Sequence, residues 1–177
     1  MIPTMTAPHH PMRIMFVCLG NICRSPMAEA IFVHLAQQRG VGERFVVDSS
    51  GTGHWHIGDD ADHRTLATLK SHSVPINHRA RQLEGARDAD DWDLFIVMDA
   101  MNLRDAIRAG IPAEKVRLMG RYDPRLHGHA DDHPRRHVPD PYTGGDTEFQ
   151  EVYDMLSRCC AALLDELAPD AAAGPMA

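Results

Sequence analysis

A cysteine and an arginine separated by five residues stand near the start of the chain, in the run Cys18-Leu19-Gly20-Asn21-Ile22-Cys23-Arg24-Ser25. A loop of this length that opens onto a helix gathers backbone N–H groups and the helix N-terminus around one anion. The planar guanidinium of Arg24 can hold two phosphoryl oxygens at once. The same positive field favours the thiolate form of Cys18, which is the nucleophilic form. This spacing therefore predicts attack on phosphate by Cys18, inside a binding loop formed by residues 19–25.

The residues around this loop supply the elements that it needs. Residues 13–17 form a nearly unbroken apolar run, as in a buried parallel strand. Ser25 and Pro26 are suited to the start of a helix, and Gly40 ends the apolar pattern that follows them. A buried cysteine that only fills space is the competing interpretation. The strand–loop–helix context favours the catalytic one.

Strand and helix patterns alternate along the whole chain. Strands are expected at 13–17, 45–49, 93–98 and 115–119, and helices at 26–39, 62–72, 99–109 and 147–167. This order predicts an α/β fold with a doubly wound four-stranded parallel sheet and flanking helices. Ligands in such folds bind beyond the carboxyl ends of the strands, which is where the loop after the first strand lies.

The 177 residues fit one domain, which we expect to span residues 12–167. Residues 1–11 read as a disordered extension and residues 168–177 as a flexible tail. The net charge of -7 argues against a nucleic-acid partner, and no apolar segment approaches the ~20 residues of a membrane span. The four cysteines show no disulfide framework and suit a reducing compartment, so a cytoplasmic protein is expected.

Displacement of phosphate from an ester also requires a proton donor for the leaving oxygen. Asp140 in Pro139-Asp140-Pro141-Tyr142 is the best candidate, because two prolines stiffen the loop around its carboxyl group. From spacing alone, an ordinary Asp-Pro turn is the better explanation of this segment.

Taken together, these segments resemble the low-molecular-weight protein tyrosine phosphatase family. The resemblance rests on CLGNICRSPMAE at 18–29 and DPY at 140–142, and it continues at 48–52, 78–83 and 98–104. It covers approximately residues 12–167. It implies a protein-tyrosine phosphatase that acts on phosphotyrosine-containing proteins, releases inorganic phosphate and needs no metal or other cofactor.

The resemblance also implies a role for each matching position. Cys18 becomes a phosphocysteine, Arg24 binds the phosphoryl group, and Asp140 acts as general acid and then as general base. Asp99 supports the site, and Cys23 can trap oxidised Cys18 as a disulfide. Further implied positions are a network under the loop at Asn21, Ser25, Ser49 and His78, and cleft walls at Trp55 and Tyr142.

Three other functions remain as alternatives. An arsenate reductase on the same fold needs two further cysteines, and residues 80–100 contain none. A phosphoarginine phosphatase is disfavoured by Ile22, because similar members carry threonine there. A non-catalytic phosphate-binding module does not require both Cys18 and Asp140.

The sequence departs from the family pattern in two places. Thr143 stands where many members have a second aromatic residue, so aromatic flanking on that side is in question. The segment 121–139 is long and contains His127, His129, His133 and His137. It lacks fixed metal-ligand spacing, so a solvated loop is expected there in place of a metal site.

Overall fold

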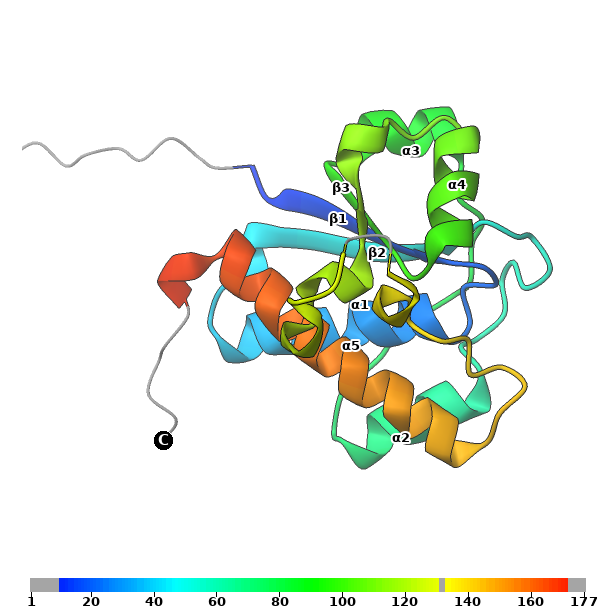
Figure 1. Ribbon diagram of the computed structural model, residues 1–177, viewed down its shortest axis with the longest axis vertical. Coiled ribbons are helices and arrows are strands. Elements are labelled where there is room, and N and C mark those ends of the chain that lie inside the picture. The colour runs from blue at the N-terminus through cyan, green and yellow to red at the C-terminus, as the bar shows by residue number, and fades with distance from the viewer. Residues whose placement is uncertain (1–9, 131–132, 172–177) are drawn as a thin grey trace, which may run out of the picture.

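The protein is built on one parallel sheet of four strands in the order β2-β1-β3-β4 (Figure 1). The computed structural model describes residues 10–130 and 133–171. The strands are β1 (Met12–Cys18), β2 (Phe45–Gly51), β3 (Leu94–Val97) and β4 (Val116–Leu118). The predicted doubly wound α/β fold is confirmed, and each strand lies within two residues of its expected bounds.

The central strand β1 determines where the site lies. It pairs in register with β2 from Met12↔Phe45 to Cys18↔Gly51, and with β3 from Ile14↔Leu94 to Val17↔Val97. Because all strands are parallel, their carboxyl ends meet along one edge of the sheet. The loop that follows Cys18 therefore emerges in the middle of that edge.

Helices cover both faces of the sheet (Figure 1). The helices α1 (Arg24–Gln38), α2 (His63–Ser71) and α5 (Asp146–Leu167) lie on one face, where Phe16 packs in the larger core cluster with Phe32 of α1 and Leu156 of α5. The helices α3 (Gly85–Asp91) and α4 (Ala100–Arg108) cover the other face, where Val17 belongs to a smaller cluster. The alternation of β1 side chains between two clusters explains its unbroken apolar sequence.

The helix α3 was not predicted. Its seven residues, GARDADD, carry no apolar stripe, so periodicity gives no signal for them. It is held instead by tertiary contacts, because the buried Asp88 carboxylate accepts hydrogen bonds from the Glu84 N–H (2.7 Å) and from Arg81 (3.1 Å). The helix α1 also begins earlier than expected, at Arg24, with Cys23 in the N-cap position in place of Ser25.

The segment 121–139, which was expected to be a solvated loop, is exposed at most of its described positions but is anchored to the domain at four buried ones. Short 3₁₀ turns at Met119–Tyr122, Pro124–Leu126 and Pro134–Arg136 pack it onto the domain, and Tyr122, Asp123, Arg136 and Val138 are buried. The Asp123 carboxylate accepts two hydrogen bonds from Arg158 of α5, at 2.8 and 3.1 Å. Within residues 10–130 and 133–171, no cluster of three or more His, Cys, Asp or Glu side chains could hold a metal ion.

Chain packing continues beyond residue 167, where the flexible tail was expected to begin. Ala168 is fully buried, and a 3₁₀ turn at Pro169–Ala171 brings Asp170 to Arg44, with two contacts of 2.7 Å. The rest of the expected tail, 172–177, and most of the expected N-terminal extension, 1–9, lie outside the described residues.

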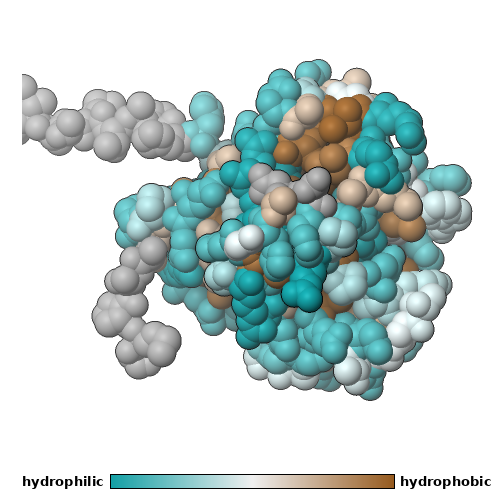
Figure 2. Space-filling model, viewed as in Figure 1, coloured by the Kyte–Doolittle hydropathy of each residue, from teal (hydrophilic) through white to brown (hydrophobic). Residues whose placement is uncertain are grey.

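The surface in Figure 2 is largely hydrophilic, with one gathering of hydrophobic side chains in the hollow between α4 and β4. That groove is lined by Ala100, Leu103, Val116 and Leu118 among others. No helix among the described residues has the length and apolar character to cross a membrane.

Candidate active site

The Cys18 side chain lies at the carboxyl end of β1, under the loop that curls over it. Its sulfur is 3.0 Å from the Ser25 hydroxyl and accepts the Asn21 backbone N–H at 3.3 Å. Only 2% of the residue is exposed. The contacts of its sulfur come from a hydroxyl and an N–H group, which are the kinds of donor that stabilise a thiolate.

Asn21 fixes the shape of the loop. Its φ of 56° places it in the left-handed region, which asparagine tolerates better than most residues. Its side-chain amide donates to the Ser25 and Ser49 hydroxyls, both at 2.9 Å, and its side-chain oxygen accepts the Arg81 N–H at 2.8 Å. Because Ser25 accepts from Asn21, its own hydrogen is free to point toward the Cys18 sulfur.

A second group of contacts, made by His78, Glu29 and Ser49, anchors Asn21. Nε2 of His78 lies 2.8 Å from the Asn21 carbonyl, and Nδ1 of the same ring lies 3.8 Å from the Glu29 carboxylate. The Ser49 hydroxyl donates to Glu29 at 2.6 Å. The loop is thus held by hydrogen bonds to β2, to the segment 78–81 and to α1.

Arg24 links the phosphate-binding loop to the carboxylates of Asp99 and Asp140. Its Nη1 donates to Asp99 at 2.7 Å and to the Val138 carbonyl at 3.1 Å, and its Nη2 donates to Asp140 at 3.1 Å. Burial alone would lower the pKa of Arg24, but the negative charges at Cys18, Asp140 and Asp99 outweigh it and raise the pKa. Arg24 therefore stays cationic.

Asp99 both orients Arg24 and caps α4. Its other oxygen accepts the Asn102 N–H at 2.8 Å at the start of that helix. Burial raises the pKa of Asp99, but the N–H donors and Arg24 outweigh burial and hold it below its usual range. Asp99 is an anion in the pH range of most cells.

The loop after β2 closes on the phosphate-binding loop at Gly51. A Cβ at Gly51 would lie 2.7 Å from the Leu19 carbonyl oxygen, which is too close for any side chain. The N–H groups of Thr52 and Gly53 donate to the carbonyls of Cys18 and Leu19, at 2.9 and 2.8 Å. These bonds turn loop carbonyls away from the anion site and hold the loop against β2.

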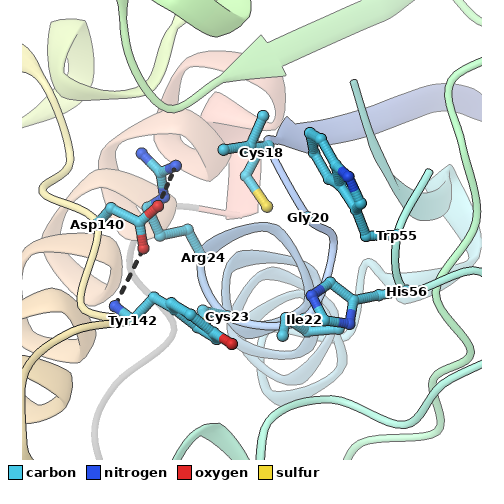
Figure 3. Close-up of a pocket in the computed structure, with 10 residues that line it drawn as sticks. Cys18, Gly20, Ile22, Cys23, Arg24, Trp55, His56, Asp140 and Tyr142 are labelled. Atoms are coloured by element: carbon cyan, nitrogen blue, oxygen red, sulfur yellow. Dashed lines mark hydrogen bonds and ion pairs between the residues drawn. The ribbon is translucent and has the colours of Figure 1, made fainter. Parts of the chain in front are cut away.

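A cavity of about 200 Å³ opens above Cys18. Figure 3 shows the Cys18 sulfur between Asp140 and Tyr142 on one side and Trp55 and His56 on the other. Trp55 and Tyr142 are 65% and 52% exposed, so large apolar side chains stand at its mouth. A nucleophile, an anion cradle and a carboxyl group thus share one cleft with aromatic walls.

Comparison with known proteins agrees with this geometry. Residues 13–173 match the family model described as low molecular weight phosphotyrosine protein phosphatase. The chain belongs to that family. A pig protein named low molecular weight phosphotyrosine protein phosphatase is 38% identical over 87% of this chain and 94% of its own length.

Solved structures of other phosphatases have the same fold as this phosphatase. A protein tyrosine phosphatase from Entamoeba histolytica superposes with a TM-score of 0.80 at 31% identity, covering 90% of this chain and 98% of that chain. A Drosophila arginine phosphatase superposes with a TM-score of 0.77 at 32% identity, covering 88% of this chain and 98% of its own.

The predicted site residues of this phosphatase lie together. Cys18, Asn21, Ser25, Ser49 and His78 form one hydrogen-bonded set, and Arg24 joins Asp99 and Asp140 in a second set. The other predicted loop residues line the cavity with Trp55 and Tyr142. Sequence reasoning missed Glu29, His56 and Arg81. Two of these lie inside quoted family segments, 18–29 and 78–83, but nothing in their residue type or spacing indicates a contact with Asn21 or Ser49.

The remaining cysteines differ in their surroundings. Cys23 lines the cavity but is only 5% exposed, and burial, followed by the nearby Asp62 carboxylate, raises the pKa of its thiol to about 12. Cys159 and Cys160 are fully buried on α5, and burial raises the pKa of Cys159 to about 12 as well. Both are core residues, and neither borders the cavity.

Proposed function

We propose that this protein is a metal-independent phosphatase that hydrolyses phosphotyrosine in proteins through a phosphocysteine intermediate. The observation that carries the proposal is the single cleft in which the Cys18 sulfur faces Arg24 and Asp140. The exposed rings of Trp55 and Tyr142 favour an aromatic phosphate ester over a short alkyl ester, because they can flank its ring.

In the first step, the Cys18 thiolate attacks phosphorus, and the bond between phosphorus and the tyrosyl oxygen breaks. Protonated Asp140 donates its proton to that oxygen, so neutral tyrosine leaves. Arg24 and the loop N–H groups hold the equatorial oxygens, where negative charge accumulates in the transition state.

In the second step, a water molecule attacks the phosphocysteine. Asp140, now a carboxylate, accepts a proton from that water, while the S–P bond breaks and inorganic phosphate forms. The Ser25 hydroxyl, 3.0 Å from the sulfur, stabilises the departing thiolate. Asn21, Ser49 and His78 keep the loop in the shape that both steps require.

Four unpaired thiols support assignment to a reducing compartment, and we assign the protein to the cytoplasm. The substrate class is tested with a panel of phosphotyrosine, phosphoserine and phosphoarginine peptides, with arsenate reduction assayed separately. Turnover of the phosphotyrosine peptides alone is expected. A preference for phosphoarginine, or turnover only with arsenate, would overturn the proposal.

A further inference from the structure

We propose that Arg64 is a positioning residue that aligns the general acid Asp140 by clamping its loop to the phosphate-binding loop. The inference rests on the proposed function, because it concerns the proton transfer assigned to Asp140. Arg64 lies in the first turn of α2 and does not line the cavity, so it acts only through other residues.

The first half of the clamp joins α2 to the phosphate-binding loop. The Ile22 carbonyl accepts the Asp62 N–H at 2.8 Å and the Thr65 hydroxyl at 3.2 Å. Asp62, the N-cap of α2, binds Arg64 through three hydrogen bonds: its carboxylate accepts the backbone N–H and Nε at 2.9 Å, and Nη2 at 2.8 Å. The guanidinium is therefore fixed in orientation relative to the loop.

The second half joins Arg64 to the loop that carries Asp140. Its Nη1 donates to the Gly144 carbonyl at 2.7 Å. Its guanidinium carbon lies 4.5 Å from the ring centre of Phe149, a fully buried residue of α5, and 5.8 Å from that of Tyr142. One side chain thus contacts the backbone and the aromatic ring of the turn that follows Asp140.

The turn at residues 141–144 connects Arg64 to the carboxyl group of Asp140. The Gly144 N–H donates to the Pro141 carbonyl at 2.8 Å and closes the turn, and the Tyr142 N–H donates to the Asp140 carboxylate at 3.1 Å. The Asp140 side chain is 45% exposed, so few protein atoms hold it apart from Tyr142 and Arg24. Displacement of the turn therefore displaces the carboxyl group.

The test is a double-mutant cycle between Arg64 and Asp140, measured on phenyl phosphate and p-nitrophenyl phosphate. For Arg64→Ala we expect kcat/KM on phenyl phosphate to fall about 10- to 100-fold, since misplacement of a catalytic group by ~1 Å has effects of that size. This ratio reports the first step alone, because hydrolysis of the phosphocysteine is common to both substrates. The loss should be much smaller on p-nitrophenyl phosphate, whose leaving group needs little protonation. In the Asp140→Ala background, Arg64→Ala should change kcat/KM by less than about twofold.

Two further variants separate positioning from general damage. Arg44→Ala removes another arginine that contacts an aspartate through two nitrogens, far from the site, and should leave kcat unchanged. Arg64→Lys keeps the charge without the planar fork, so it should fold and still lose activity on phenyl phosphate. The inhibition constant of inorganic phosphate should stay within about twofold of wild type, because the phosphate loop itself is retained.

Additive losses in the double mutant, equal losses on both aryl phosphates, or full activity of Arg64→Lys would each overturn the inference. These outcomes are distinct from failure of the proposed function, which would appear as wild-type protein that does not hydrolyse phosphotyrosine peptides.

Discussion

Individual residues at the end of β1 and in the loop that follows it have distinct chemical roles. Cys18 supplies the electron pair, Ser25 and the Asn21 N–H stabilise its charge, and Arg24 joins the loop to Asp99 and Asp140. Each of these side chains has a defined hydrogen-bond partner. Single substitutions therefore remove one chemical contribution at a time.

Cys18→Ser should abolish turnover and leave a folded protein that still binds phosphate. The loop donors and Arg24 remain, but an alcohol of high pKa replaces the thiolate. Turnover is measured with p-nitrophenyl phosphate, and phosphate binding is measured by protection against thermal unfolding. Activity within about tenfold of wild type, or 1.4 kcal/mol of barrier, would show that Cys18 is not the nucleophile.

Asp140→Ala should lower kcat by about 10²- to 10⁴-fold on phenyl phosphate, the range typical of a general acid. The loss should shrink on esters whose leaving group is already stable as an anion. A plot of log kcat/KM against leaving-group pKa measures this directly, because kcat/KM reports the step in which the ester bond breaks. Equal slopes for wild type and variant would remove Asp140 from the role of acid.

Cys23→Ser should preserve activity under reducing conditions and impair recovery from hydrogen peroxide. Peroxide oxidises the Cys18 thiolate to a sulfenic acid, and attack by Cys23 would form a disulfide with loss of water. Because burial raises the pKa of Cys23 to about 12, this trapping should be slow near pH 7 and faster at higher pH.

Recovery of peroxide-treated enzyme with dithiothreitol is the measurement, with phosphate as the protecting ligand. Cys159→Ser serves as the matched control, because that thiol is also buried and lies outside the cavity. Equal recovery of wild type and Cys23→Ser would assign Cys23 to packing alone.

At the scale of elements, the site depends on how closely two loops approach each other. The segment 51–53 lies against the phosphate-binding loop, and Gly51 leaves no room for a Cβ beside Leu19. The clash is with backbone atoms, which cannot rotate away. The two loops therefore behave as one unit.

Gly51→Ala should lower the free energy of unfolding by about 1–3 kcal/mol, because one loop must move to admit the methyl group. It should also weaken phosphate binding, since the displaced residues carry the N–H donors. Urea unfolding and phosphate titration check both effects. Gly128→Ala is the control, because a Cβ there meets no atom within 4 Å; a similar loss in both variants would contradict this explanation.

Residue types and spacing alone predict the contiguous part of the site, whereas the distant positions Ser49, His78 and Asp99 were predicted only from the family resemblance. The phosphate-binding loop lies within eight consecutive residues, from Cys18 to Ser25, and its strand and helix have clear apolar patterns. The Glu29 and Arg81 contacts depend on distant segments meeting Asn21 and Ser49, which local spacing does not encode. The helix α3 escaped prediction for the same reason, since Arg81 and Asp88 hold it in place of an apolar stripe.

At the scale of the whole molecule, the segment 119–138 is fastened to α5 by Asp123 and Arg158. Burial raises the pKa of Asp123, but Arg158 and the Arg125 N–H outweigh burial and hold it below 3.8, its ordinary value. A carboxyl group whose pKa is lowered by folding stabilises the native state above its ordinary pKa. That contribution is lost as pH falls through the lower, folded-state value.

Asp123→Asn should therefore reduce the free energy of unfolding at pH 7 by about 1–3 kcal/mol, the usual effect of weakening a buried charged hydrogen bond. The difference in free energy of unfolding between wild type and Asp123→Asn should decrease as the pH falls from 5 to 3. Urea unfolding over this range is the measurement, with Asp146→Asn in the exposed first turn of α5 as control. A difference that stays constant with pH would show that the Asp123 charge is not responsible.

The anchors of the phosphate-binding loop come from five regions of the chain, near residues 29, 49, 80, 99 and 139. During synthesis on a ribosome, Cys18 emerges more than a hundred residues before Val138 and Asp140. Until Val138 and Asp140 have been synthesised, the nascent chain contains the Cys18 thiol but lacks the general acid. Arg24 also lacks its contacts with these two residues. Return of activity after dilution from denaturant should therefore coincide with the slowest folding phase.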